Sequence, residues 1–253
     1  MDEPRHAGKA GAAGSGYDVF AAIYDEWSSE MTEDVPFYVE LAKEANGPVV
    51  ELAVGSGRVA VPVARALGRR VVGIDSSPAM LAQAREAALE AGVELELRDG
   101  DMRNLELADP PALVYCPYRA LLHLPTWADR RRVFARVAGA LRPGGRFAWN
   151  AFVFDGALAA SFHDRKRRKE GTSIWEYVRY DWADCRINVE AWLDGEDETA
   201  RRRLSLWWIA RSEWEGLVDV AGLEVEALYG WFDRRPFDET SREFVWVARR
   251  PPG

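Results

Sequence analysis

Residues 49–60 read VVELAVGSGRVA, an apolar run followed by two glycines and then by residues that suit a helix. A short apolar run of this kind is typical of a buried strand, and Gly55 and Gly57 lie where that strand turns into the helix. Glycine has no Cβ, so the backbone of such a turn can approach a ligand closely. The amides at the start of the helix favour a carboxylate or a phosphate there.

Asp75 ends the next apolar run, residues 70–75, about 20 residues after the glycines. A carboxylate at the end of a second strand can accept hydrogen bonds from both hydroxyls of a ribose, so the two segments predict a nucleoside-containing ligand. The pattern Gly55-x-Gly57-x-x-Ala60 also satisfies the dinucleotide fingerprint. The glycines alone therefore leave a nicotinamide, a flavin, or a tight turn without a ligand as alternatives.

The composition is that of a globular protein: 253 residues, 48% hydrophobic and 29% charged, with a net charge of −8. It excludes disordered, collagen-like and coiled-coil classes, and the negative charge disfavours a broad phosphate-binding surface. Cys116 and Cys185 are too few for a disulfide framework or a four-cysteine zinc site, and we expect no metal. Without an apolar run of about 18 residues or a signal-peptide core, we expect a cytoplasmic protein with no membrane segment.

The segments around the glycine loop predict the fold class. Apolar strands alternate with helical segments, which indicates a doubly wound, mostly parallel α/β sheet with helices on both faces. Together with two late strands they make a Rossmann-like sheet of seven strands. The expected strands span residues 49–53, 70–75, 93–98, 112–116, 146–154, 224–232 and 242–249.

The ends and the middle of the chain differ from this pattern. Residues 1–16 are small and polar, so we expect a flexible tail followed by a single domain over residues 17–253. Residues 155–211 alternate in residue type, which predicts an inserted antiparallel meander that serves as an acceptor cap or an interface. The basic run at residues 165–169 is expected to be a solvated loop. Ser212 and Glu215 predict a capping box for the helix that follows.

Further motifs accompany the glycine loop. Glu51-x-Ala53-x-Gly55 leads into Asp75, and DGDM at residues 99–102 and RPGG at residues 142–145 follow in order. Over roughly residues 17–250 the chain resembles the class I S-adenosylmethionine-dependent methyltransferases. Ala53 departs from the glycine usual at the first position of this loop, but it adds only a methyl group. The resemblance implies S-adenosylmethionine as the cofactor.

The resemblance implies which residues hold the methionine part of that cofactor. Gly55 and Gly57 would pass close to it, with Glu51 near its amino end. Arg58 and Tyr24 would be candidates for its carboxylate. Tyr24 also follows Tyr17 and Phe20 at helical spacing, which is equally typical of a packed helix face, and Arg58 is equally suited to a solvated helix surface.

The resemblance also implies roles at the adenosine part. Asp75 would hold the ribose hydroxyls, and Met80 would pack near the adenine. Asp101 and the backbone of Met102 would address the adenine edge, while Cys116 would lie beside the methyl donor. The alternatives are a core position for Met80 and a turn-forming role for Asp101.

Residues for the acceptor are less well marked. His123 follows the fourth expected strand in CPYRALLHLP, at the edge where such sheets bind ligands. A weaker resemblance to sugar-amine N-methyltransferases implies a general base there, and a packed or capping histidine is the alternative. Tyr118 and Trp231 are candidates for substrate binding. Eight of the eleven tryptophans lie from Trp175 onward, which fits an acceptor pocket, packing on a sheet, or a homo-oligomer interface.

The resulting hypothesis is an enzyme that transfers a methyl group to nitrogen or oxygen of a small molecule and releases S-adenosylhomocysteine. A nucleic-acid methyltransferase and a non-catalytic S-adenosylmethionine-binding module are the alternatives. The acidic net charge disfavours nucleic acid as a partner.

Overall fold

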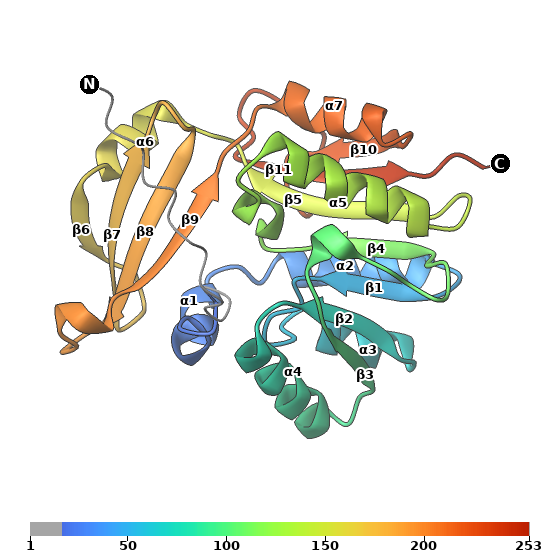
Figure 1. The fold of residues 1–253 in the computed structure, drawn as a ribbon, viewed down its shortest axis with the longest axis horizontal. Coiled ribbons are helices and arrows are strands. Elements are labelled where there is room, and N and C mark those ends of the chain that lie inside the picture. The colour runs from blue at the N-terminus through green and yellow to red at the C-terminus, as the bar shows by residue number, and fades with distance from the viewer. Residues whose placement is uncertain (1–16, 253) are drawn as a thin grey trace, which may run out of the picture.

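The computed structural model describes residues 17–252 and arranges them around two separate β-sheets (Figure 1). The predicted tail, residues 1–16, lies outside the described residues. Sheet A has seven strands in the order β10-β11-β5-β4-β1-β2-β3. They are β1 (Val49–Leu52), β2 (Val71–Asp75), β3 (Leu95–Asp99), β4 (Leu113–Cys116), β5 (Arg146–Phe152), β10 (Glu224–Tyr229) and β11 (Glu243–Arg249).

The pairing in sheet A is parallel from β5 to β3, whereas β11 runs antiparallel to both β5 and β10. β1 is central and pairs with β2 on one side and β4 on the other. Because the chain order reverses direction between β1 and β4, the loops after these strands diverge there and leave room for a ligand. The predicted doubly wound sheet of seven strands is thus confirmed.

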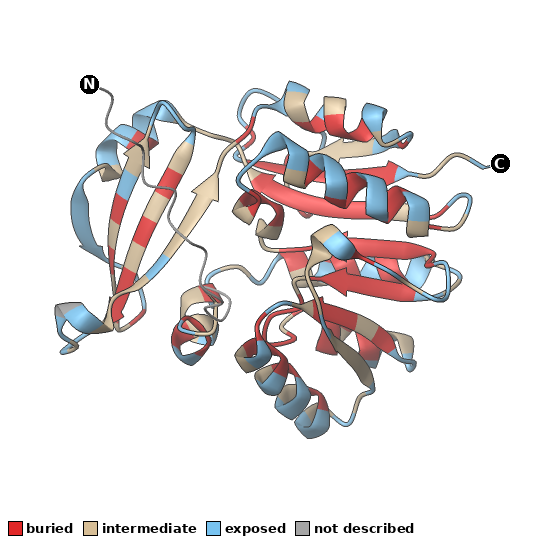
Figure 2. Cartoon of the chain, in the orientation of Figure 1, coloured by how far each residue is buried: buried red, intermediate tan, exposed pale blue. Residues whose placement is uncertain are grey.

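Helices cover both faces of sheet A. They are α2 (Asp34–Glu44), α3 (Ala60–Leu67), α4 (Pro78–Ala91), α5 (Trp127–Ala140) and α7 (Arg211–Val220). Alternate residues of β4 serve opposite faces: Val114 packs with α5 and α7, and Tyr115 packs with α2 and α3. The inner strands β1, β4, β5 and β11 are therefore almost wholly buried, as Figure 2 shows, whereas the edge strands β3 and β10 are partly exposed. Within residues 17–252, no helix is both long and apolar enough to cross a bilayer.

Sheet B is an excursion of the chain between β5 and α7, and it lies to one side of sheet A (Figure 1). It begins with α6 (Gly156–Phe162) and continues as an antiparallel sheet of four strands, β6 (Arg165–Arg168), β7 (Ile174–Asp181), β8 (Arg186–Leu193) and β9 (Arg202–Trp207). A 3₁₀ turn, Glu198–Ala200, precedes β9. The meander predicted from the sequence thus exists as four strands, although its role as a cap or an interface stays a prediction.

Two local expectations were wrong. The basic run forms the edge strand β6 instead of a loop, because it pairs with β7 and Arg167 reaches the buried Glu176 at 2.6 Å. The expected Ser212 cap is absent: α7 begins at Arg211, its N-cap is Ala210, and no side chain caps it. The N-terminal segment forms a 3₁₀ turn, Ala21–Ile23, and the short helix α1 (Tyr24–Ser28).

Candidate active site

A cavity of about 310 Å³ lies at the carboxyl edge of sheet A. Its walls come from the N-terminal segment and from the loops that follow β1, β2, β3 and β4. This is the switch point of the sheet, where open parallel sheets bind ligands. The predicted site residues that line it are Tyr24, Ala53, Gly55, Asp75, Met80, Asp101, Met102, Tyr118 and His123.

The loop between β1 and α3 carries left-handed backbone at its key positions. The φ angles are 54° at Ala53, 55° at Gly55 and 85° at Gly57. Gly55 lines the cavity, and a Cβ on it would stand 3.4 Å from the ring of Tyr24. Gly57 does not line the cavity; a Cβ there would press on Val61 at 3.3 Å. Gly55 therefore allows close approach to a ligand, whereas Gly57 allows the loop to pack against the helices.

Asp75 fixes this loop from the end of β2. Its Oδ2 accepts a hydrogen bond from the N–H of Gly55 at 2.9 Å, and its Oδ1 accepts one from the N–H of Ser77 at 2.8 Å. Burial raises the pKa of the Asp75 carboxyl despite these bonds. Each oxygen has a further lone pair, so the carboxylate can also accept hydroxyl donors from the cavity.

Asp101 and Met102 line the side of the cavity that follows β3, and Met80 closes it from α4. Asp101 accepts the backbone N–H of Arg103 at 2.8 Å and pairs with its guanidinium at 2.5 Å. The Arg103 side chain beside it holds the pKa of Asp101 below its usual range. Any ligand contact of Asp101 would therefore share a carboxylate already bound to Arg103.

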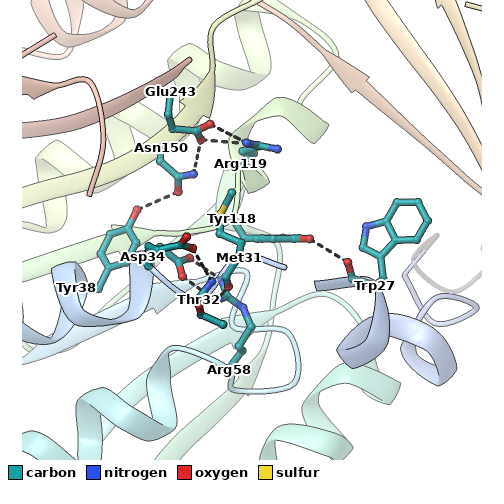
Figure 3. A network of polar contacts seen from close by, with 11 residues as sticks. Trp27, Met31, Thr32, Asp34, Tyr38, Arg58, Tyr118, Arg119, Asn150 and Glu243 are labelled. Atoms are coloured by element: carbon teal, nitrogen blue, oxygen red, sulfur yellow. Dashed lines mark hydrogen bonds and ion pairs between the residues drawn. The ribbon is translucent and has the colours of Figure 1, made fainter. Parts of the chain in front are cut away.

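Arg58 and Cys116 do not line the cavity. The Arg58 guanidinium binds both carboxylate oxygens of Asp34, at 2.8 and 2.6 Å, and the carbonyl of Met31 at 2.7 Å (Figure 3). It also stacks on Tyr118, 5.0 Å from the ring centre. Cys116 is completely buried at the end of β4. In the structure Arg58 therefore binds other residues of the protein and does not face the cavity.

Two further predicted residues lie apart from the cavity lining. Glu51 is buried in β1, where desolvation raises the pKa of its carboxyl well above the usual range. Its Oε2 has no hydrogen-bond partner among residues 17–252. Trp231 packs beside Phe232, with ring centres 5.3 Å apart, in the apolar cluster under α2. The structure does not bring Trp231 to the cavity.

Tyr17 is a cavity residue that the sequence did not assign to the site. Its hydroxyl lies 2.6 Å from Nε2 of His123, and Nδ1 of His123 lies 3.1 Å from the carbonyl of Ser205 in β9. A carbonyl only accepts, so Nδ1 carries the proton and Nε2 accepts the Tyr17 hydroxyl. Burial lowers the pKa of His123 to about 4. The imidazole is therefore neutral at physiological pH.

Arg119 is a second feature that the sequence did not reveal. Tyr118 and Arg119 both adopt left-handed backbone, with φ of 53° and 63°. Two contacts hold these residues. Arg119 forms an ion pair with the buried Glu243 of β11, and the guanidinium of Arg58 stacks on the ring of Tyr118 (Figure 3). Strained backbone of this kind persists only where its surroundings enforce it, and it clusters at functional sites. A glycine at position 118 or 119 would have indicated left-handed backbone in the sequence, but neither residue is a glycine.

Comparisons with known proteins support one family. Residues 49–145 match the family model described as a methyltransferase domain. The 27-O-demethylrifamycin SV methyltransferase of Amycolatopsis mediterranei is 26% identical over 94% of this chain and 96% of its own length. The solved structure of the CcbJ methyltransferase from Streptomyces caelestis superposes with a TM-score of 0.80 at 25% identity, covering 94% of this chain and 98% of that one. The chain is a class I S-adenosylmethionine-dependent methyltransferase.

The cavity of this methyltransferase fits its cofactor, S-adenosylmethionine. Asp75 would offer its remaining lone pairs to the ribose hydroxyls, and Gly55 would let the cofactor pass close to the backbone. Glu51 does not line this cavity, so its contact with the ammonium of the methionine part stays a prediction. Among residues 17–252, no cluster of histidine, cysteine, aspartate and glutamate could hold a metal ion.

Proposed function

We propose that this methyltransferase acts on a small-molecule acceptor at nitrogen or oxygen. The observation that carries the proposal is how its cavity is closed. The rings of Tyr17 and Tyr24 lie 6.1 Å apart, those of Tyr24 and Tyr118 also 6.1 Å, and those of Tyr17 and His123 5.0 Å. Aromatic side chains therefore stand around the cavity from three segments of the chain, which suits an acceptor small enough to pass between them.

Two relatives support this class of acceptor. The one that matches nearly the whole chain is named for 27-O-demethylrifamycin SV. The other, from Saccharopolyspora spinosa, is named a dTDP-4-amino-2,3,4,6-tetradeoxy-D-glucose N,N-dimethyltransferase and is 30% identical over 51% of this chain and 51% of its own length. One name denotes an oxygen acceptor and the other a nitrogen acceptor, so both stay within the proposal.

The bound cofactor supplies a methyl group on a sulfonium, and the chain must align the acceptor with it. Neutral His123 has a pKa of about 4, which makes it a weak proton acceptor at physiological pH. Its contribution is to hold Tyr17, which lines the cavity and whose oxygen can still accept a hydrogen bond. That oxygen can accept the N–H or O–H of an acceptor and orient it. An acceptor that needs little help to lose its proton, such as an amine or an acidic hydroxyl, suits this site.

Charge and free thiols bear on the partners and the location of this enzyme. Nucleic acid is disfavoured because the chain carries a net charge of −8 and its basic run is one exposed edge strand, β6. A homo-oligomer through sheet B stays a prediction. A cytoplasmic location is supported by the two free thiols, one of them exposed at Cys185, since reducing compartments preserve such groups.

Calorimetry followed by an acceptor screen tests the proposal. We expect S-adenosylmethionine and S-adenosylhomocysteine to bind and NAD not to bind. The purified enzyme is then offered amino-sugar glycosides, hydroxylated macrolactones and phenols, with S-adenosylhomocysteine release as the readout. Methylation in one of these groups supports the proposal. Cofactor binding with no turnover of any of them, or turnover of RNA instead, would contradict it.

A further inference from the structure

Residues of the loop after β4 point in two different directions. Pro117, Tyr118 and Ala120 line the cofactor cavity, whereas Arg119 does not. Arg119 instead turns toward β5 and β11, where its guanidinium lies 5.6 Å from the ring centre of Phe152 and against Glu243. Phe152 ends β5 and Glu243 begins the antiparallel β11, so Arg119 lies at the same carboxyl edge of sheet A as the cavity, where cofactor and acceptor must meet. Arg119 thus places a guanidinium at this edge, directly after the cavity residue Tyr118.

The position of Arg119 is set by a chain of buried groups (Figure 3). Its Nε donates to both oxygens of Glu243, at 3.1 and 3.2 Å, and its Nη2 donates to Oε2 at 2.7 Å. Glu243 also accepts Nδ2 of Asn150 at 2.7 Å, and Asn150 in turn accepts the hydroxyl of Tyr38 at 3.0 Å. Glu243, Asn150 and Tyr38 are fully buried. The network therefore anchors the guanidinium to α2, β5 and β11 together.

One donor of this guanidinium is left over. Nη1 of Arg119 has no hydrogen-bond partner among residues 17–252, and 34% of the side chain is exposed although Glu243 beside it is fully buried. Figure 3 shows one end of the guanidinium directed away from Glu243. A rigid donor with an open side costs little entropy to use, because its orientation is already fixed.

We propose that Arg119 recognises the acceptor by donating from Nη1 to one of its neutral oxygens, a carbonyl, hydroxyl or ether. The paired carboxylate of Glu243 cancels the charge of the guanidinium, so Arg119 offers a directed donor instead of a net positive field. An acceptor with a neutral oxygen near its nucleophilic atom fits this arrangement better than one carrying a phosphate. This inference rests on the proposed small-molecule function and names the feature by which the acceptor is selected.

The alternative is a structural role, in which Arg119 only clamps the left-handed pair Tyr118–Arg119. The two roles differ in what they do to acceptor selectivity. A clamp affects all acceptors alike, whereas a recognition residue affects only acceptors that carry the recognised oxygen. Comparing an acceptor with analogues that each lack one oxygen separates the two.

The experiment uses the acceptor found in the screen and its single-deoxy analogues, with kcat/KM measured for each. Arg119→Lys keeps the ion pair but loses the fork, and Arg119→Met with Glu243→Gln removes the donor and the buried charge together. Arg130→Lys is the matched control, since Arg130 pairs with Glu213 at 2.7 Å between α5 and α7, away from the cavity. Calorimetry with S-adenosylmethionine verifies that each variant keeps its cofactor site.

In the unmodified enzyme and in Arg130→Lys, we expect one deoxy analogue to lose at least about tenfold in kcat/KM, the value of a good hydrogen bond. In both Arg119 variants that discrimination should fall to within about twofold of unity, with cofactor affinity retained. If the discrimination persists there, Arg119 is a clamp and the inference fails while the proposed function stands. If the unmodified enzyme methylates no acceptor at all, the proposed function fails, and the inference falls with it.

Discussion

The N–H of Gly55 donates to Oδ2 of Asp75 at 2.9 Å, so the carboxylate at the end of β2 holds the glycine loop at the end of β1. One side chain would thereby couple the ribose and methionine parts of the proposed cofactor site. It explains why a loop with left-handed backbone at Ala53 keeps its shape beside a cavity. Any change at Asp75 should act on the ribose and on the methionine side together.

Asp75→Asn should weaken S-adenosylmethionine binding by at least about 30-fold, because hydrogen bonds to a charged acceptor contribute about 1.5–3 kcal/mol each. The NH₂ group of the asparagine would also face a backbone N–H, of Gly55 or of Ser77, that donates to the Asp75 carboxylate in the wild type. Asp99→Asn is the matched control, since Asp99 is the register partner of Asp75 on β3 and lies outside the cavity lining. Isothermal calorimetry measures both. Equal affinities for the two variants would rule out the ribose assignment.

Tyr17→Phe should lower kcat about tenfold while cofactor affinity stays within about threefold, because the change removes one oriented hydrogen-bonding group. The phenyl ring preserves the packing against Tyr24 and His123. Tyr177→Phe, in β7 of sheet B and away from the cavity, provides the same chemical change as a control. Steady-state kinetics with saturating acceptor measures kcat for both variants. An unchanged kcat in Tyr17→Phe would mean that Tyr17 only packs against its neighbours.

The neutral state of His123 predicts a pH dependence of stability. An unfolded histidine binds a proton near pH 6.5, whereas burial lowers the pKa of His123 to about 4. Because the unfolded state binds more protons in this window, the stability that neutral His123 contributes is complete above about pH 6.5. It is lost as the pH falls toward 4.

Urea unfolding at pH 7 and pH 4.5 measures this loss, with His123→Gln as the reference. Subtracting the variant removes the effect of carboxyls with raised pKa such as Asp75. The wild type should lose about 2–3 kcal/mol more than the variant between the two pH values. Parallel losses would mean that His123 titrates normally in the folded protein.

Ala53→Gly should stabilise the enzyme. Ala53 has a φ of 54°, a left-handed conformation that costs a residue with a Cβ about 1–2 kcal/mol. Glycine removes this strain but adds about 0.5–1 kcal/mol of unfolded-state entropy, so we expect a net gain of about 0.5–1 kcal/mol. Calorimetric melting should show a rise of about 1–4 °C. Ala60→Gly at the start of α3 is the control and should lower the melting temperature.

The sequence predicted sheet A well because its signals are local. Apolar runs mark the buried strands. Ser77 and Thr126, which cap α4 and α5 by accepting hydrogen bonds from the N–H groups of Met80 and Asp129, are local signals of the same kind. The positions of Gly55 and Asp75 at the cavity could be predicted because the glycine loop directly follows one strand and Asp75 ends the next. Ser212 misled because a serine in the first turn of a helix resembles a serine before it.

The remaining site residues depend on contacts that distant segments make. Tyr17 meets His123 across 106 positions of the chain, and Arg119 meets Glu243 across 124. Arg58 appeared free in the sequence, but α2 brings Asp34 to it. Spacing along a chain contains no information on such pairs, and only the packing of the N-terminal segment and β11 against the sheet creates them.

The excursion that forms sheet B leaves the chain after β5 and rejoins it before α7, so its two ends lie beside each other on an intact sheet A. Its carbonyl at Ser205 reaches the cavity region through His123, while the loops that cradle the cofactor belong to sheet A. Evolution can therefore lengthen, shorten or reshape this excursion without rebuilding the cofactor-binding half. Descendants of one ancestral enzyme could in this way inherit the same methyl donor and diversify in what they modify.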